Sequence, residues 1–194
     1  MKIIGLTGGI ATGKSTVSKM LRKSGYEVID ADAIVHELQA TGSPLLLAIA
    51  NAFGPTILHE DGSLNRGKLG KIIFDNTDAR AQLDAIVHPA VRAKFEERIR
   101  SSKADVLFLD IPLLFEAGFD DLTDANLVIR ASEKMQLKRL KIRDALTGQE
   151  AQARIRSQMP MGKKVERADF VIDNNGGMHQ LEENVEKFLS EILR

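Results

Sequence analysis

The chain has 194 residues, a length typical of one domain with an added lobe, and it contains no cysteine, which excludes a disulfide scaffold and thiolate chemistry. Its 27 Lys and Arg residues balance 27 Asp and Glu residues, so no overall basic field favours a nucleic-acid partner. No apolar run is long enough for a leader sequence or a membrane span, and we therefore expect a soluble, cytoplasmic protein that does not associate with membranes. We expect a monomer, with a weak oligomer as the alternative.

The pattern G-x-x-x-x-G-K-[ST] lies close to the N-terminus, between a short apolar strand predicted for 3–7 and a helix predicted for 15–23. A loop in this position turns backbone N–H groups and a helix N-terminus toward an anion. Lys14 can reach the β- and γ-phosphates of a nucleotide, and the Ser15 hydroxyl can bind Mg²⁺. We expect nucleotide phosphates to bind at Gly8, Gly9, Ile10, Ala11, Thr12, Gly13, Lys14, Ser15 and Thr16.

A second strand is predicted for Tyr26–Asp30, with a helix over Ala33–Ala40. Asp32 lies at their junction and has two interpretations. It can cap the helix N-terminus, or it can be an acid that faces the reacting centre, because ligands of open parallel sheets bind outside the carboxyl ends of the strands. The two roles are compatible.

The segment from Gly42 to about Ser102 is almost wholly helical in pattern, and we interpret it as a lobe inserted after the second strand. Its predicted helices cover 44–53, 66–74 and 78–100. His88-Pro89 falls inside the third, where proline removes a backbone donor and favours a kink or break. A lone histidine is usually a surface or core residue, but at such a break His88 becomes a candidate substrate contact.

A third strand, Val106–Asp110, is apolar until its last residue. In P-loop proteins an aspartate at this place orders Mg²⁺, directly or through water, and we expect Asp110 to do so. Pro112 cannot continue the strand because it lacks an N–H donor. We expect Pro112 and Leu113 to form an apolar floor of the cleft beside the carboxylate of Glu116.

A fourth strand is predicted for Ala125–Arg130, then a helix capped by Ser132 that reaches Arg143 and a further helix over Gln149–Gln158. From Arg130 to Arg167 there are eleven Lys and Arg residues against four Asp and Glu residues, a local net charge of +7. Such a run is commonly a solvated helical face. Beside a phosphate loop, an arginine-bearing lid that clamps phosphate oxygens is the better interpretation.

A fifth strand, Ala168–Asp173, a loop beginning at Asn174 and an amphipathic helix over Met178–Leu193 complete the chain. Strand–helix alternation predicts an α/β fold with a five-stranded parallel sheet flanked by helices. We divide the chain into a nucleotide-binding core (1–32, 104–136 and 164–194), a helical substrate domain (33–103) and a lid (137–163).

The phosphate loop, Asp32 and Asp110 should meet at the carboxyl edge of this sheet. Charge neutralisation, in-line positioning and exclusion of water by a lid are the requirements of phosphoryl transfer to a hydroxyl. A GTPase is disfavoured because the chain has no Asn-Lys-x-Asp motif.

The sequence resembles the dephospho-coenzyme A kinase family from Ile4 to about Gly176. The residues that carry the resemblance are Gly5-Leu6-Thr7-Gly8-Gly9-Ile10, Gly13-Lys14-Ser15, Asp30-Ala31-Asp32, Asp61-Gly62-Ser63-Leu64, His88-Pro89, Asp110 to Glu116, Arg154-Ile155, Gln158-Met159-Pro160 and Ala168 to Asn174.

The resemblance implies a P-loop NTPase fold like that of nucleoside monophosphate kinases. It also implies ATP-dependent phosphorylation of the ribose 3′-hydroxyl of dephospho-coenzyme A, the last step of coenzyme A synthesis, with Mg²⁺. By this analogy Asp32 is the base, Arg139 is a lid arginine on the ATP phosphates, and Asn174 lies near adenine. The helical domain, with His88, holds the coenzyme substrate.

Three departures from the family pattern are Ala11-Thr12 in the phosphate loop, Asn65 where Asp is general, and Asp144-Ala145 where Asn-Gly is common. Two alternatives stay open: another small-molecule kinase of the same architecture, such as a nucleoside monophosphate kinase, and a non-catalytic ATP-binding module. The alternative kinase would prefer another acceptor, and the module would need Lys14 but no base at Asp32.

Overall fold

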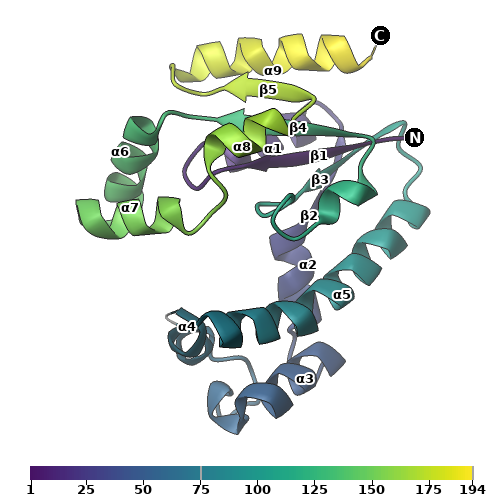
Figure 1. Ribbon diagram of the computed structural model, residues 1–194. Helices are drawn as coiled ribbons and strands as arrows, with labels where there is room; N and C mark the ends of the chain where they lie inside the picture. Colours follow the sequence, from purple (N-terminus) through teal and green to yellow (C-terminus); the bar gives the residue numbers. More distant parts are fainter. Residues whose placement is uncertain (75, 194) are drawn as a thin grey trace. The chain divides into compact units, whose positions relative to one another are not determined.

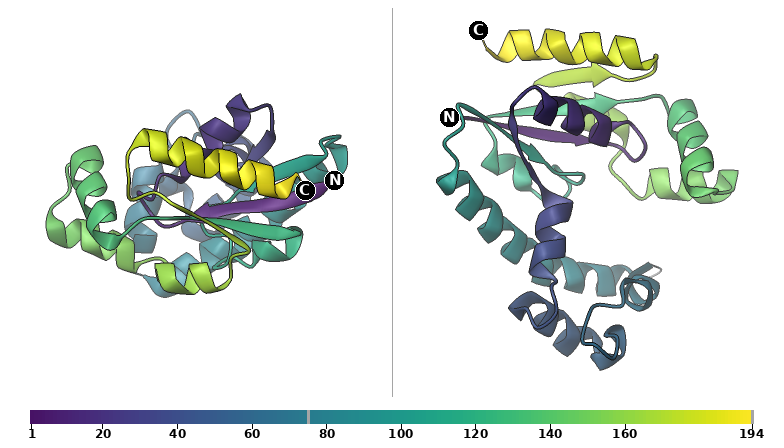
Figure 2. Two further views of the ribbon diagram at one scale, coloured as in Figure 1. Left: turned by 90° about the horizontal axis from the view of Figure 1, so that it is seen from above. Right: turned by 180° about the vertical axis from the view of Figure 1, so that it is seen from behind.

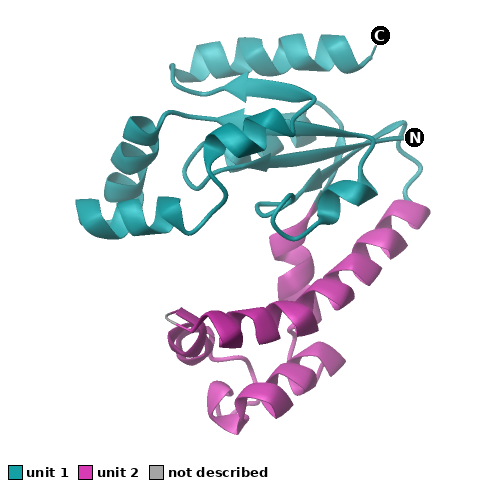
Figure 3. Cartoon of the chain, in the orientation of Figure 1, with its two compact units in different colours: residues 1–29, 102–194 teal, residues 30–101 magenta. Residues whose placement is uncertain are grey.

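The computed structural model describes residues 1–74 and 76–193, which form two compact units. Residues 1–29 and 102–194 make up unit 1, and residues 30–101 make up unit 2 (Figure 3). An inserted helical unit was predicted in this part of the chain. The exact predicted boundaries, and a separate lid over 137–163, stay predictions.

Five parallel strands form the central sheet in the order β2-β3-β1-β4-β5 (Figure 1). The β1 strand lies in the middle, where Leu6 pairs with Asp110 of β3 and with Leu127 of β4. This confirms the predicted fold class. The strands are β1 (Lys2–Gly8), β2 (Glu27–Asp30), β3 (Val106–Asp110), β4 (Ala125–Arg130) and β5 (Phe170–Asp173).

Helices α1 (Lys14–Lys23) and α9 (Met178–Ile192) cover one face of the sheet, and the short helix α8 (Met161–Glu166) lies on the other (Figure 2). The face under α1 and α9 carries apolar residues at every second position of the strands, as expected where successive side chains point to opposite sides of a sheet. Its buried cluster includes Ile4, Leu6, Val17, Leu21, Phe108, Leu127, Ile129, Val185 and Phe188.

Helices α6 (Glu133–Asp144) and α7 (Gly148–Arg156) follow β4 and correspond to the two predicted arginine-rich helices. Thr147 caps α7 in a reciprocal capping box with Glu150, and this satisfies backbone donors at the start of the helix. The predicted range for α7, Gln149–Gln158, begins one residue and ends two residues later than the helix itself. The sequence did not predict α8, whose six residues show no helical period.

Unit 2 contains α2 (Ala31–Leu38), α3 (Pro44–Phe53), α4 (Arg66–Phe74) and α5 (Thr77–Ser101) around a core that includes Leu46, Ile49 and Leu69. The short 3₁₀ turn Pro55–Ile57 follows α3, and a second one, Phe119–Leu122, belongs to unit 1.

Helix α5 continues through Pro89, so a break at His88-Pro89 is excluded, while the predicted kink stays a prediction. Apolar side chains before and after the proline, including Val87 and Ala90, pack against the core of unit 2 and offset the hydrogen bond that Pro89 removes. Within the described parts of the chain, α5 and the other helices are too short or too polar to cross a membrane.

Candidate functional site

The phosphate loop connects the buried end of β1 to the first turn of α1. Gly13 lies at the N-cap of α1 with φ +97°, and no side chain caps the helix there, so its N-terminal N–H groups remain for an anion. A Cβ at Gly13 would stand 2.1 Å from the side-chain nitrogen of Asn174. Both the backbone angle and the close approach therefore require glycine at this position.

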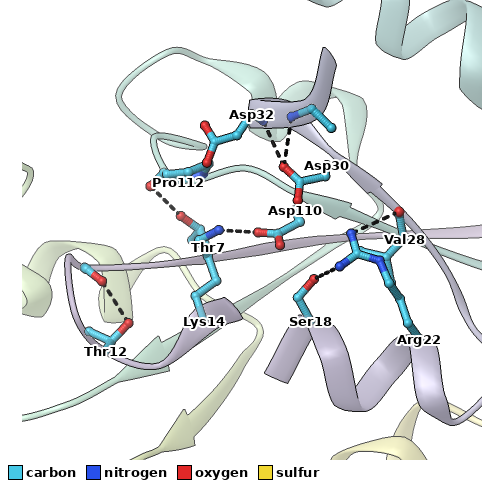
Figure 4. Close-up of polar contacts among 12 residues, drawn as sticks. Thr7, Thr12, Lys14, Ser18, Arg22, Val28, Asp30, Asp32, Asp110 and Pro112 are labelled. Atoms are coloured by element: carbon cyan, nitrogen blue, oxygen red, sulfur yellow. Dashed lines mark hydrogen bonds and ion pairs between the residues drawn. The ribbon is translucent and has the colours of Figure 1, made fainter. Parts of the chain in front are cut away.

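Lys14 and Asp110 are brought together at the carboxyl edge of the sheet. The Lys14 ammonium contacts the carboxylate of Asp110, which is 3% exposed (Figure 4). A buried carboxylate needs such a partner because desolvation penalises its charged form. The sequence predicted Lys14 as a site residue from the phosphate-loop pattern and Asp110 from its place at the end of an apolar strand. Their mutual contact is a finding of the structure.

The carbonyl oxygens of the loop, on the side away from its N–H groups, accept hydrogen bonds from side chains. Arg139 donates to the carbonyls of Ala11 (3.3 Å) and Thr12 (3.2 Å) and to that of Asn174 (2.9 Å). The Asn174 amide donates to the Thr12 carbonyl at 2.7 Å. Arg139 and Asn174 thus lie against the phosphate loop, while contacts of Arg139 with phosphate and of Asn174 with adenine stay predictions.

Two further side chains hold the loop at Ile10, and the sequence did not predict them as site residues. Gln136 of α6 donates from Nε2 to the Ile10 carbonyl, and the Ile10 N–H donates to Oε1 of Gln158; both distances are 2.7 Å. No sequence pattern marked Gln136 as a functional residue. Gln158 belongs to the family motif Gln158-Met159-Pro160, and only this motif could have indicated it.

The segment after Asp110 is pinned from two sides. The Pro112 carbonyl accepts hydrogen bonds from Thr7 Oγ1 at 3.0 Å and from Lys164 Nζ at 3.2 Å. The fully buried Lys164 also pairs with Glu116 at 2.9 Å, a contact that no sequence pattern indicated. Leu113 remains 41% exposed on this fixed segment, as an apolar floor requires.

Asp32 and His88 belong to unit 2, which we describe by itself. Asp30, and not Asp32, caps α2: its carboxylate accepts from the backbone N–H groups of Asp32 (2.9 Å) and Ala33 (3.3 Å). The capping interpretation of Asp32 is therefore wrong, because the helix begins at Ala31, two residues earlier than predicted. Asp32 is exposed in the first turn of α2. His88 faces Asp84 on α5 at 3.7 Å.

A salt-bridge cluster fixes the loop after β5. Arg130 donates to Asp173 through Nε (3.0 Å) and Nη2 (2.8 Å), and Asn175 donates to the same carboxylate from its backbone and side chain. Burial alone would raise the pKa of Asp173, but the hydrogen bonds from Arg130 and Asn175 outweigh it and hold that pKa below its ordinary value. The loop that carries Asn174 is thus held in place by charge.

Ser15 and Asp110 offer the oxygen donors that suit Mg²⁺. The described residues contain no group of three or more His, Cys, Asp or Glu side chains arranged for a metal. Mg²⁺ in nucleotide sites is commonly held by one or two protein oxygens together with phosphates and water, so a hydroxyl and a carboxylate fit it.

A sequence model of the dephospho-CoA kinase family matches residues 2–180. The chain is 48% identical to a dephospho-CoA kinase of Symbiobacterium thermophilum over 96% of its own length and 79% of that protein. It is 46% identical to the dephospho-CoA kinase of Carboxydothermus hydrogenoformans, over 95% of this chain and 91% of that one.

Solved structures agree with these matches. The dephospho-CoA kinase from Campylobacter jejuni superposes with a TM-score of 0.75 and 32% identity, over 99% of this chain and 98% of that one. The protein TT1252 from Thermus thermophilus gives a TM-score of 0.85 and 34% identity, over 98% and 97%. A shikimate kinase from Bacteroides thetaiotaomicron, at 16% identity and a TM-score of 0.57 over 100% and 99%, shares the fold.

Proposed function

The chain belongs to the dephospho-CoA kinase family, and on this premise we propose that it transfers the γ-phosphoryl group of ATP to the ribose 3′-hydroxyl of dephospho-CoA. The products are CoA and ADP, and the reaction is the last step of CoA biosynthesis. The match over residues 2–180 carries the proposal, because it spans both the phosphate loop and the inserted helical unit.

The phosphate loop supplies the positive field that the reaction needs. Its N–H groups and the α1 N-terminus bind the phosphates, and Lys14 neutralises charge that develops on the transferred group. In the structure Lys14 pairs with Asp110, so the ammonium is held near the end of β3 before ATP arrives. Arg139 is the further cation proposed to reach the phosphates.

Asp32 is proposed as the base. As the acceptor oxygen bonds to the γ-phosphorus and the bond to the ADP oxygen breaks, the hydroxyl proton passes to the Asp32 carboxylate. Support comes from the helix cap: because Asp30 performs that role, Asp32 has no capping duty in the first turn of α2. His88, Pro112 and Leu113 are proposed to contact the dephospho-CoA acceptor.

Ser15 and Asp110 would hold Mg²⁺ with the bound nucleotide. When bound, the ion offsets the negative charge of the β- and γ-phosphates. The balanced charge supports an enzyme without a nucleic-acid partner, and the lack of a long apolar run supports a cytoplasmic location. A monomer is proposed, and size-exclusion chromatography with light scattering would test it.

An acceptor screen tests the proposed activity. ADP release is measured with MgATP and dephospho-CoA, AMP, CMP or shikimate as the acceptor, and the 3′-phosphorylated product is identified by mass spectrometry. We expect dephospho-CoA to give the highest kcat/KM. A higher value with a nucleoside monophosphate or shikimate would assign the chain to another kinase activity, and ATP binding without any transfer would indicate a binding module.

The variant Asp32→Asn tests the base. It should retain ATP binding and lose about 10²–10⁴-fold in kcat, the usual contribution of a general base. Turnover equal to that of the unchanged enzyme would remove Asp32 from the mechanism.

A further inference from the structure

Ile10 is held by two glutamine side chains from separate parts of the chain. Gln136 lies on α6, directly before the predicted lid, and Gln158 follows α7, near the other end of that segment. The amide of Gln136 donates to the Ile10 carbonyl, and the carbonyl of Gln158 accepts from the Ile10 N–H, each at 2.7 Å. Both peptide planes beside Ile10 are therefore fixed by side chains.

The next residue explains why these planes need to be held. Ala11 has φ +58°, in the left-handed region that L-residues other than Gly, Asn and Asp rarely adopt. Such a conformation is strained and persists only where surrounding contacts enforce it. The Ile10 carbonyl belongs to the peptide that enters Ala11, so the Gln136 hydrogen bond acts directly on the strained link.

The contact of α6 with the loop is close. Gln136 is 4% exposed. A Cβ on Gly9 would lie 2.7 Å from its Nε2 and 2.9 Å from Cε of Met161, so a larger residue there would displace the ends of both side chains. A buried amide that loses its partner is costly, which makes the Gln136 bond a strong constraint on the loop. Beside it is a cavity of about 390 Å³, whose lining includes Gln136, Gln152 and Gln158.

We propose that Gln136 and Gln158 are positioning residues for phosphoryl transfer: together they fix the Ile10 peptide planes and hold the phosphate loop in its ATP-binding conformation. They act through the loop backbone. Because Gln136 lies in the first turn of α6 and Gln158 lies just after α7, the position of the α6–α7 segment and the shape of the loop are coupled. The inference rests on the proposed function for its kinetic readout only, since ATP binding can be measured without an acceptor.

A charge-matched pair of variants separates this role from general packing. Gln136→Glu turns a carboxylate toward the Ile10 carbonyl, so a hydrogen bond is replaced by repulsion between two acceptors. Gln158→Glu keeps an acceptor for the Ile10 N–H. Each variant adds one negative charge beside the same residue, so a difference between them reports hydrogen bonding. Gln152→Leu is the control, because Gln152 lines the same cavity but its amide contacts Glu133 instead of the loop.

Affinity is measured on the full chain by calorimetric titration with Mg²⁺ and a non-hydrolysable ATP analogue, and thermal unfolding without nucleotide verifies that each variant is folded. Gln136→Glu should bind at least about fivefold more weakly than Gln158→Glu, the loss of one buried hydrogen bond, and Gln152→Leu should bind like the unchanged protein. In turnover assays Gln136→Glu should raise KM for ATP and leave KM for dephospho-CoA unchanged.

Equal losses in Gln136→Glu and Gln158→Glu, or an equal loss in Gln152→Leu, would overturn the proposal. Gln158→Met, which lacks the acceptor, should bind more weakly than Gln158→Glu, and the reverse order would also contradict it. If the unchanged enzyme fails to phosphorylate dephospho-CoA, the proposed function fails, while the titrations still rank these variants.

Discussion

At the residue scale, two acids two positions apart have different roles: Asp30 caps a helix, and Asp32 is the proposed base. The Asp30 carboxylate accepts from two backbone N–H groups of α2, and Asp32 takes no part in that cap. The sequence shows only Asp30-Ala31-Asp32, in which either acid can cap a helix that begins next to it. The choice depends on where the chain leaves the β2 strand, and a two-residue shift in a helix start lies beyond the resolution of a sequence pattern.

Asp30→Ala should therefore lower the free energy of unfolding by about 1 kcal/mol through loss of the cap. Asp32→Ala, its matched partner, leaves this cap intact, so it should lower the free energy of unfolding less than Asp30→Ala does and should lose most turnover. Urea unfolding and ADP release distinguish them. Equal destabilisation by the two substitutions would contradict this division of roles.

The turn between α6 and α7 shows how the chain accommodates a departure from the family pattern. Ala145 stands in the left-handed region with φ +53°, and Asp144 bonds Arg143 and Arg154 on either side of it. The hydrogen bond from Arg143 is the main reason that the pKa of Asp144 is lowered. The ion pairs thus hold a turn that a glycine would adopt without strain.

Ala145→Gly should raise the free energy of unfolding by up to about 1 kcal/mol, because glycine removes the strain of the left-handed conformation. Ala153→Gly, in the exposed interior of α7, should have the opposite effect by a similar amount. Thermal unfolding of both variants provides the measurement. A lower midpoint for Ala145→Gly would show that the turn is not strained.

At the scale of elements, strong apolar runs were predictable and short or interrupted ones were not. The strands Val106–Asp110 and Ala125–Arg130 and the helix Pro44–Phe53 have the predicted bounds, because buried runs end at charged residues and the helix is framed by Ser43-Pro44 and Gly54. Helix α5 shows the opposite case. A proline argues for a break, but contacts with three other helices, which no local pattern reveals, keep it continuous.

Pro89→Ala should raise the free energy of unfolding by about 1–2 kcal/mol, since it restores a backbone donor inside α5 and loses only part of that gain to greater freedom of the unfolded chain. Pro44→Ala is the control: Pro44 occupies the first position of α3, where no intrahelical donor is needed, so its replacement should bring no gain. Chemical denaturation compares them. An equal or negative effect at Pro89 would mean that the helix is distorted around the proline.

At the scale of the whole molecule, the site depends on contacts that join distant parts of the chain. The phosphate-loop residues were predictable because one short pattern contains them. Gln136, Gln158 and Lys164 were not, because each meets its partner only after the sheet has formed. A local sequence pattern thus identifies the phosphate loop, but it does not identify the distant side chains that hold this loop in place.

Acid should destabilise the whole fold. The pKa values of Glu37, Asp144, Glu150 and Asp173 are all lowered, mostly by hydrogen bonds and ion pairs. A lowered folded-state pKa contributes stability above the unfolded-state pKa, about 4, and loses it as the pH falls through the folded value. Unfolding free energies measured from pH 7 to pH 3 should fall below about pH 4. Asp173→Asn should be less stable at pH 7 and show a shallower decline, and an unchanged slope would contradict the assignment.

The central place of β1 has a consequence for how the protein is made. The β1 strand and the phosphate loop are synthesised before the neighbours of β1 in the sheet, β3 and β4, which end at Asp110 and Arg130. Contacts between such distant segments form slowly because long loops must close before any pairing is gained. On the ribosome, the phosphate loop therefore emerges before the two strands that flank β1, and it cannot reach its final surroundings until both have been made.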